Sequence, residues 1–172
     1  MPLRDDLVLQ IPSLKKKYLK YTDYAEKQIT DIFSQEQLDK AELKTAYTFA
    51  HAFFENNGNG TFKKQDLPLE SQYSCVYGML AQDVDGDGFK DLVLTGNFHS
   101  VKPEIGNYDG SYGIFLKGNG KNGFQSQQIS ESGLLVTGQA RDMISLKVGN
   151  KNMIFIAKNN DPLQVFEIKT KK

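Results

Sequence analysis

The sequence predicts a mainly β protein that begins with a helical segment. Apolar residues recur at helical spacing up to about residue 44, and from about residue 46 they alternate with polar residues. Two Asn/Gly-rich turns with apolar flanks, in residues 53–62 and 114–124, are typical of β-hairpins. We therefore expect a helical segment in residues 1–45 and a β region in residues 46–172.

Residues 13–44 are expected to be helical. Two pairs, Asp23 with Glu26 and Ser34 with Gln37, resemble capping boxes. The residues at helical spacing between them are Ala25, Ile29, Ile32 and Phe33. We expect this segment to be an insertion that packs on the β region.

The β region contains a weak internal repeat with an offset of 62 residues, as between Phe53 and Phe115 or between Asn57 and Asn119. The same offset places the apolar run 92–94 against 154–156, so that turns match turns and strands match strands. It predicts one antiparallel four-stranded sheet, three strands of a second sheet and a preceding hairpin at 46–66. The strands of the first sheet are expected at 76–82, 90–96, 112–117 and 123–129, and those of the second at 139–147, 151–157 and 163–168.

One turn of the first sheet, Asp83–Asp91, carries four carboxylates and is called the aspartate loop below. Like charges about 4 Å apart repel by about 1 kcal/mol in water and about 4 kcal/mol near a protein surface, so a cation is expected among them. Calcium takes six to eight oxygen ligands, and alternate residues of a tight loop can supply them. The predicted ligands are the side chains of Asp83, Asp85, Asp87 and Asp91 and the carbonyl oxygen of Phe89. A plain hairpin turn at Asp87-Gly88 is the alternative, but it leaves the other aspartates unexplained.

An EF-hand does not fit this loop. The twelfth position is Leu94 instead of a bidentate Glu, and the flanking residues favour strands. We therefore expect a structural calcium ion between two strands. The 62-residue offset aligns the four aspartates with Ser145, Lys147, Gly149 and Met153, so only one metal site is expected.

Composition narrows the function classes. Lys+Arg and Asp+Glu each number 21, which favours neither nucleic acid nor an anionic membrane as a partner. The single cysteine, Cys75, cannot form an internal disulfide, and one cysteine with two histidines argues against a zinc site. No apolar run is long enough for a membrane span, and Met1–Pro12 lacks the apolar core of a signal peptide.

The run 81–94, followed by 113–116 and the turn that ends at Phe124, resembles the FG-GAP/VCBS repeat family over residues 46–168. The resemblance implies blades of a β-propeller with Ca²⁺ between the first two strands of a blade. It also implies an extracellular, periplasmic or surface-attached protein that works in adhesion. About two repeats cannot close a propeller, so a partial propeller with open sheet edges is expected, and such edges favour self-association.

The resemblance implies a non-enzymatic module that presents loops to a protein or glycan. The alternative is an accessory or catalytic domain of a polysaccharide-active enzyme, for which Glu104 and Asp109 are the available acidic residues. Both lie in the long connection Asn97–Ser111, called the arm below. Long connections in compact domains are often functional, although this one equally fits a structural cover over the helical segment. The candidate ligand-binding residues of the arm are Phe98, His99, Glu104, Tyr108 and Asp109.

Overall fold

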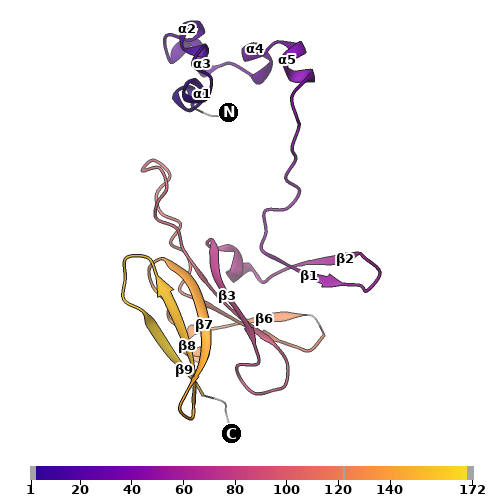
Figure 1. Ribbon diagram of the computed structural model, residues 1–172, viewed down its shortest axis with the longest axis vertical. Coiled ribbons are helices and arrows are strands. Elements are labelled where there is room, and N and C mark those ends of the chain that lie inside the picture. The colour runs from indigo at the N-terminus through magenta and orange to yellow at the C-terminus, as the bar shows by residue number, and fades with distance from the viewer. Residues whose placement is uncertain (1–2, 122, 170–172) are drawn as a thin grey trace. The chain divides into compact units, whose positions relative to one another are not determined.

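The computed structural model describes residues 3–121 and 123–169. This part of the chain is mainly β, with nine strands in three antiparallel sheets, six short α-helices and one short 3-10 helix, η1 (Leu69–Gln72) (Figure 1). None of the described helices is long and apolar enough to cross a membrane. The chain divides into two compact units, Met1–Tyr47 and Thr48–Lys172, and each is described by itself.

The first unit holds five short helices. The prediction of helices in residues 13–44 is confirmed for about half of these residues. The prediction of a continuous helical segment is wrong, because each helix ends within two turns and residues 40–51 contain no helix or strand. Helix α1 lies within the expected segment 1–45 but precedes residue 13, where the helical residues were expected to begin. The helices are α1 (Arg4–Gln10), α2 (Leu14–Lys17), α3 (Thr22–Ala25), α4 (Ile29–Ile32) and α5 (Gln35–Asp39).

Capping side chains explain where some of these helices begin. The predicted box at Ser34 is present: the Gln37 N–H donates to Ser34 Oγ at 3.4 Å, and the Ser34 N–H donates to Gln37 Oε1 at 3.0 Å. The predicted cap at Asp23 is wrong, because Asp23 lies inside α3 and accepts the Lys20 N–H instead. Competition of this kind between side chains and the helical backbone breaks the segment into short pieces.

A small core holds these helices together, since isolated helices of this length are marginal in water. Its two tyrosines, Tyr18 and Tyr24, meet edge to face with ring centroids 5.7 Å apart. The buried members are Leu14, Tyr18, Tyr24 and Ile32.

In the second unit the predicted strands appear within about two residues of their expected ends, apart from the later start of the first hairpin. The hairpin pairs β1 (Ala52–Asn56) with β2 (Phe62–Asp66). Its Phe53 ring packs edge to face on the Phe124 ring, with the ring centroids 5.7 Å apart. The four-stranded sheet has the order β3 (Val76–Gln82), β4 (Asp91–Gly96), β5 (Ile114–Gly118) and β6 (Phe124–Gln127). After α6 (Ile129–Ser132), the three-stranded sheet has the order β7 (Ala140–Val148), β8 (Lys151–Lys158) and β9 (Gln164–Ile168).

The two larger sheets share one pairing register. Met79 pairs with Leu94 in the first sheet, and Met143 pairs with Ile156 in the second. Each first strand also has a bulge at the same place, after Val76 and after Ala140. The third strands follow the same pattern, because Leu94 pairs with Ile114 and Ile156 pairs with Gln164. The first sheet thus differs mainly in its longer connection from β4 to β5, which is the arm.

The sheets meet at their first strands, β3 and β7, which lie side by side (Figure 1). Gly78 permits this approach: a Cβ there would lie 2.8 Å from Thr95 Oγ1 and 3.2 Å from the Asp142 carbonyl carbon. Behind this line of contact the facing sides of the sheets bury a common apolar core, whose members include Val93, Val136, Ala140, Ile154 and Ile156.

Replacing Ile156 by Ala should lower the free energy of unfolding by about 2–5 kcal/mol, because its fully buried side chain would leave a cavity in this core. Ile144→Ala is the matched control, since Ile144 on β7 is 54% exposed and its truncation should cost less than about 1 kcal/mol. Urea unfolding of both variants measures the difference. Equal destabilisation by the two changes would contradict the described core.

Candidate functional site

The aspartate loop connects two antiparallel strands, β3 and β4, as predicted. It brings one carboxylate oxygen each from Asp83, Asp85 and Asp91 within 4.8 Å of one another. Three of the five predicted ligands are therefore brought together by the fold, with Asp91 buried and the other two half-buried.

Backbone N–H groups hold two of these carboxylates in place. Asp83 accepts the Gly86 N–H at 2.7 Å and the Gly88 N–H at 3.0 Å, one on each oxygen. Both glycines have positive φ angles, 82° and 90°, which glycine adopts without a Cβ clash. The tight turn therefore points the N–H groups inward at Asp83.

Asp91 connects the loop to the sheet. It is fully buried; its Oδ2 accepts the Val84 N–H at 2.9 Å and its Oδ1 accepts the Gly118 N–H at 2.9 Å. A carboxylate has about four acceptor positions, so each oxygen of Asp91 keeps capacity for a further contact.

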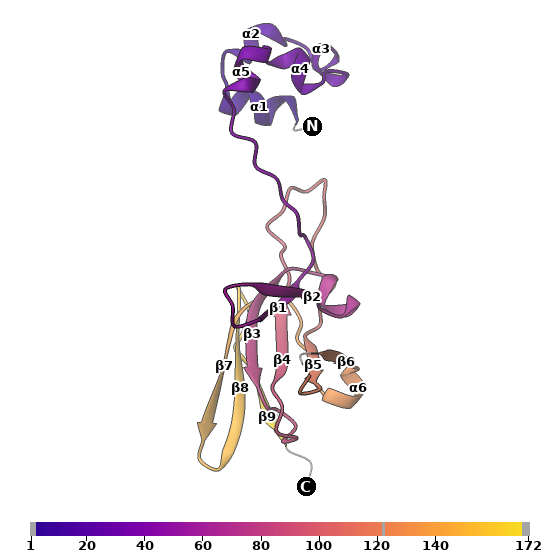
Figure 2. The same ribbon diagram turned by 90° about the vertical axis from the view of Figure 1, so that its right-hand side faces the viewer.

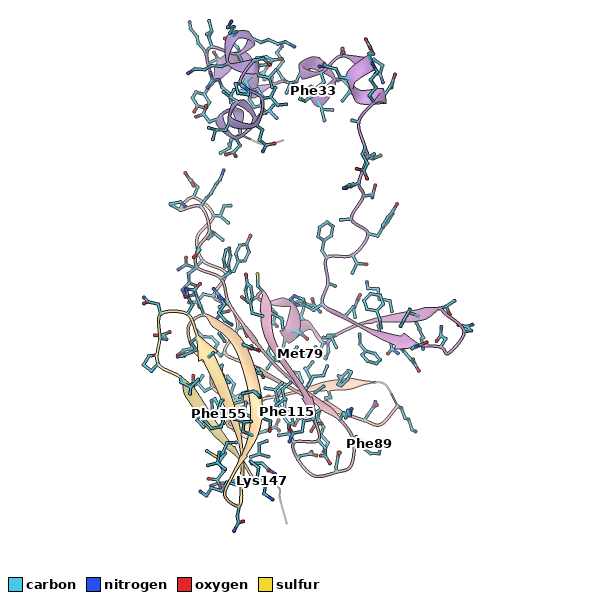
Figure 3. The ribbon with its side chains drawn as sticks, viewed as in Figure 1. Phe33, Met79, Phe89, Phe115, Lys147 and Phe155 are labelled. Carbon is cyan, nitrogen blue, oxygen red and sulfur yellow. The ribbon has the colours of Figure 1, made fainter. Side chains whose placement is uncertain are left out.

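The other two predicted ligands are placed differently. Asp87 lies outside the three-carboxylate cluster, and its Oδ1 accepts the Phe89 N–H at 2.9 Å. Phe89 (Figure 3) is 47% exposed. A Cβ on Gly120 would clash with its ring. The N–H bond from Phe89 and the nearby Lys117 ammonium lower the pKa of Asp87 below its ordinary value of 3.8.

Lys117 on β5 is the site residue that sequence reasoning missed. Its ammonium forms ion pairs with Asp85 Oδ2 and, at 2.9 Å, with Asp87 Oδ2. These two carboxylates raise the pKa of Lys117 well above its usual value. The strand register could have predicted this contact, because β5 runs antiparallel to β4 and brings residue 117 back beside the loop.

The donor set fits a hard divalent cation. Every candidate ligand is an oxygen, and calcium and magnesium prefer oxygen ligands, whereas zinc favours nitrogen and sulfur. The Lys117 ammonium is a stand-in cation in this structure, since it occupies carboxylate oxygens that an ion would otherwise contact. The cluster alone does not distinguish calcium from other hard cations.

The arm begins at the opposite end of β4 from the aspartate loop and extends beyond the sheet (Figures 1 and 2). Phe98 and Tyr108 pair in it through two backbone hydrogen bonds of 2.8 and 2.9 Å. His99 Nε2 and Asp109 Oδ1 lie 2.9 Å apart. Glu104 lies exposed near the tip, beside the turn that the Ile105 N–H closes on the Lys102 carbonyl. Four of the predicted ligand-binding residues thus lie at the base of the arm and Glu104 lies away from them.

Asn97 clamps the base of the arm. Its buried side chain donates to the Ser111 and Gly138 carbonyls at 2.7 and 3.1 Å and accepts the Ser111 N–H at 3.0 Å. Beside it, Arg141 donates to the Asn97 carbonyl at 2.8 Å and stacks over the Tyr77 ring at 4.4 Å. Sequence reasoning missed both residues.

Tyr77 continues the aromatic surface of the arm. Its ring centroid lies 6.3 Å from that of Phe98, and Phe98 pairs with Tyr108, so their side chains share one face. Tyr77 and Tyr108 are each almost half exposed. Tyr77, Phe98 and Tyr108 are together called the aromatic row, and the Arg141 guanidinium lies over the ring of Tyr77.

A cavity of about 760 Å³ opens between the two larger sheets beside the aspartate loop. Val93, Phe115 and Ile154 contribute to its apolar wall, while Asp85, Asp87 and Lys117 line its end at the loop. Lys117 therefore faces both the loop and this cavity.

Comparison of the chain with protein-family models, with curated proteins and with solved structures found no match.

Asp87→Asn should lower stability at neutral pH and lose that effect in acid. The folded-state pKa of Asp87 lies below its unfolded value, so its contribution is present above about pH 4 and is lost as the pH falls through the folded pKa. Urea unfolding of the wild type and the variant in chelator, from about pH 6 to about pH 2, measures this. A difference in midpoint that persists unchanged to the lowest pH would contradict it.

Proposed function

We propose that residues 48–172 form a calcium-stabilised β module of the FG-GAP/VCBS type that presents the arm to a protein or glycan partner. The observation that carries the proposal is the convergence of the Asp83, Asp85 and Asp91 carboxylates on a loop between two antiparallel strands. On this proposal the module is a non-enzymatic binding unit, and calcium fixes its loop instead of switching it.

The charge of the loop supports an ion. Three carboxylate oxygens within 4.8 Å repel one another, and the backbone N–H groups that they accept compensate only part of that repulsion. Calcium would be held by Asp83, Asp85 and Asp91, with Asp87 and the Phe89 carbonyl as the remaining ligands expected from the sequence. Modules that work outside the cell bind calcium with dissociation constants of about 10⁻⁴ to 10⁻³ M.

The arrangement of the sheets supports a propeller-type module. Two sheets with the same register lie side by side at their first strands and carry their later strands away from that line, as neighbouring blades do. In the 62-residue alignment, β1 and β2 correspond to β5 and β6, so the hairpin would be the outer part of a preceding blade.

The arm supports a binding role through its aromatic row. Exposed tyrosine and arginine side chains are enriched where proteins bind partners, because they bury a large area and also form hydrogen bonds. The Asn97 clamp and the paired backbone at Phe98 hold the row in place without a partner. Such preorganisation lowers the entropic cost of binding.

Calcium should raise the thermal stability of the protein, by about 2.7 kcal/mol at a free concentration one hundred times the dissociation constant. Asp83→Asn should remove most of this shift, because it deletes a ligand charge without touching the Lys117 ion pairs. Asp66→Asn, an exposed aspartate on β2, is the control and should keep the shift. Melting curves in millimolar Ca²⁺ and in excess chelator measure it, and identical wild-type curves in the two conditions would contradict a calcium site.

Shortening the arm should abolish partner binding and leave calcium binding intact. Because Phe98 and Tyr108 are a hydrogen-bonded pair, an Asn-Gly turn in place of residues 99–107 can close a two-residue hairpin between them. The same shortened chain also carries Tyr77→Ala, Phe98→Ala and Tyr108→Ala, so that the aromatic row is removed with the tip of the arm. Glycan arrays and pull-downs from surface-protein extracts, with bound proteins identified by mass spectrometry, would compare the shortened and full-length chains. Ligands retained equally by both chains would place the binding surface elsewhere.

A further inference from the structure

Lys117 contacts carboxylate oxygens that an ion in the aspartate loop would also bind. Its ammonium contacts Asp85 and Asp87 together, although these residues are on the β3–β4 loop and Lys117 is on β5. The ammonium therefore neutralises part of the loop charge without a metal. It supplies a single charge, whereas the loop carries four carboxylates.

The fold presents the lysine to the loop. Fully buried Leu116 pairs with Leu92 across β4 and β5, and the next residue, Lys117, alternates to the opposite face. Gly118 then donates its N–H to the buried Asp91 carboxylate. With strand neighbours fixed on both sides, the lysine backbone is anchored beside the aspartates.

The second sheet provides an internal comparison. The shared register places Glu167 on β9 at the position of Lys117 on β5, since Phe166 pairs with Ile154 as Leu116 pairs with Leu92. Glu167 pairs with Lys151, at the start of β8, at 2.8 Å. The third strand of each sheet therefore carries a charge opposite to that of its ion-pair partner, which lies in or next to the connection between the first two strands.

We propose that Lys117 is a built-in cation that holds the loop together without metal and that calcium must displace from Asp85 and Asp87. This inference rests on the proposed calcium site. Two positive charges compete for the same oxygens, so the lysine weakens calcium binding and at the same time stabilises the metal-free fold. Once displaced, the ammonium remains on the wall of the cavity between the sheets, which it already lines.

Lys117→Gln tests this proposal, with Lys90→Gln as the matched control. Lys90 is an exposed loop residue, and its replacement changes the net charge by the same amount without removing the Lys117 ion pairs. Isothermal titration with CaCl₂ should show about 3- to 30-fold tighter binding for Lys117→Gln than for Lys90→Gln, as expected for the loss of two partly exposed charge contacts. Melting in chelator should rank Lys117→Gln below Lys90→Gln, and saturating Ca²⁺ should remove this difference.

The outcomes separate this proposal from the calcium site itself. Calcium binding by the wild type with equal dissociation constants for the two variants would overturn the role of Lys117 and leave the calcium site standing. Binding by Lys117→Gln alone would overturn the calcium site of the wild type and the displacement of the lysine, because the lysine would then hold the loop in place of an ion. Absence of calcium binding in all three proteins would overturn both.

Discussion

The buried carboxylate of Asp91 is the contact on which the β module depends. It begins β4, and its two oxygens accept N–H groups from the aspartate loop and from the end of β5, so one side chain links three segments. A charge removed from water in this way is costly unless hydrogen bonds or an opposite charge compensate it. The N–H groups supply part of the compensation. The position of the other aspartates is then set, because the loop that closes on Asp91 also carries Asp83 and Asp85 toward it.

The two larger sheets show how one β framework accepts opposite charges. Their registers and bulges agree, yet the first has an acidic loop beside a lysine, whereas the second has lysines that flank its turn, one of which pairs with a glutamate. Structural register also corrects the alignment. Lys147 corresponds to Asp83 and not to Asp85, because the turn from β7 to β8 is shorter than the aspartate loop (Figure 3). Burial fixes the pairing of the strands, whereas the turn regions are free to change charge as long as a nearby strand residue compensates it.

Sequence periodicity predicted the strands well because alternation reflects burial directly, as for Leu94 and Ile156. Spacing within the short aspartate loop predicted a meeting of its carboxylates, and Asp83, Asp85 and Asp91 do meet, whereas Asp87 lies outside the cluster. It failed for contacts made across the sheet. Lys117, Asn97 and Arg141 contact residues from 14 to 64 positions away, and only the register shows those neighbours. The helical segment was overextended because helical spacing does not show where capping side chains interrupt a helix.

The aspartate loop and the arm lie at opposite ends of β4, and this distance limits how a metal ion at one could affect a partner at the other. The aspartate loop precedes this strand and the arm follows it, so about 20 Å of paired backbone lies between them. The side chains of Val93 and Leu94 along that path are buried, and a close-packed core does not adjust gradually to a shift at one end. On the proposed function, an ion at the loop would therefore act on the arm mainly by stabilising the sheet to which both belong. This geometry favours calcium as a structural element over calcium as a switch, since a switch needs a segment with two arrangements that the ion can bias.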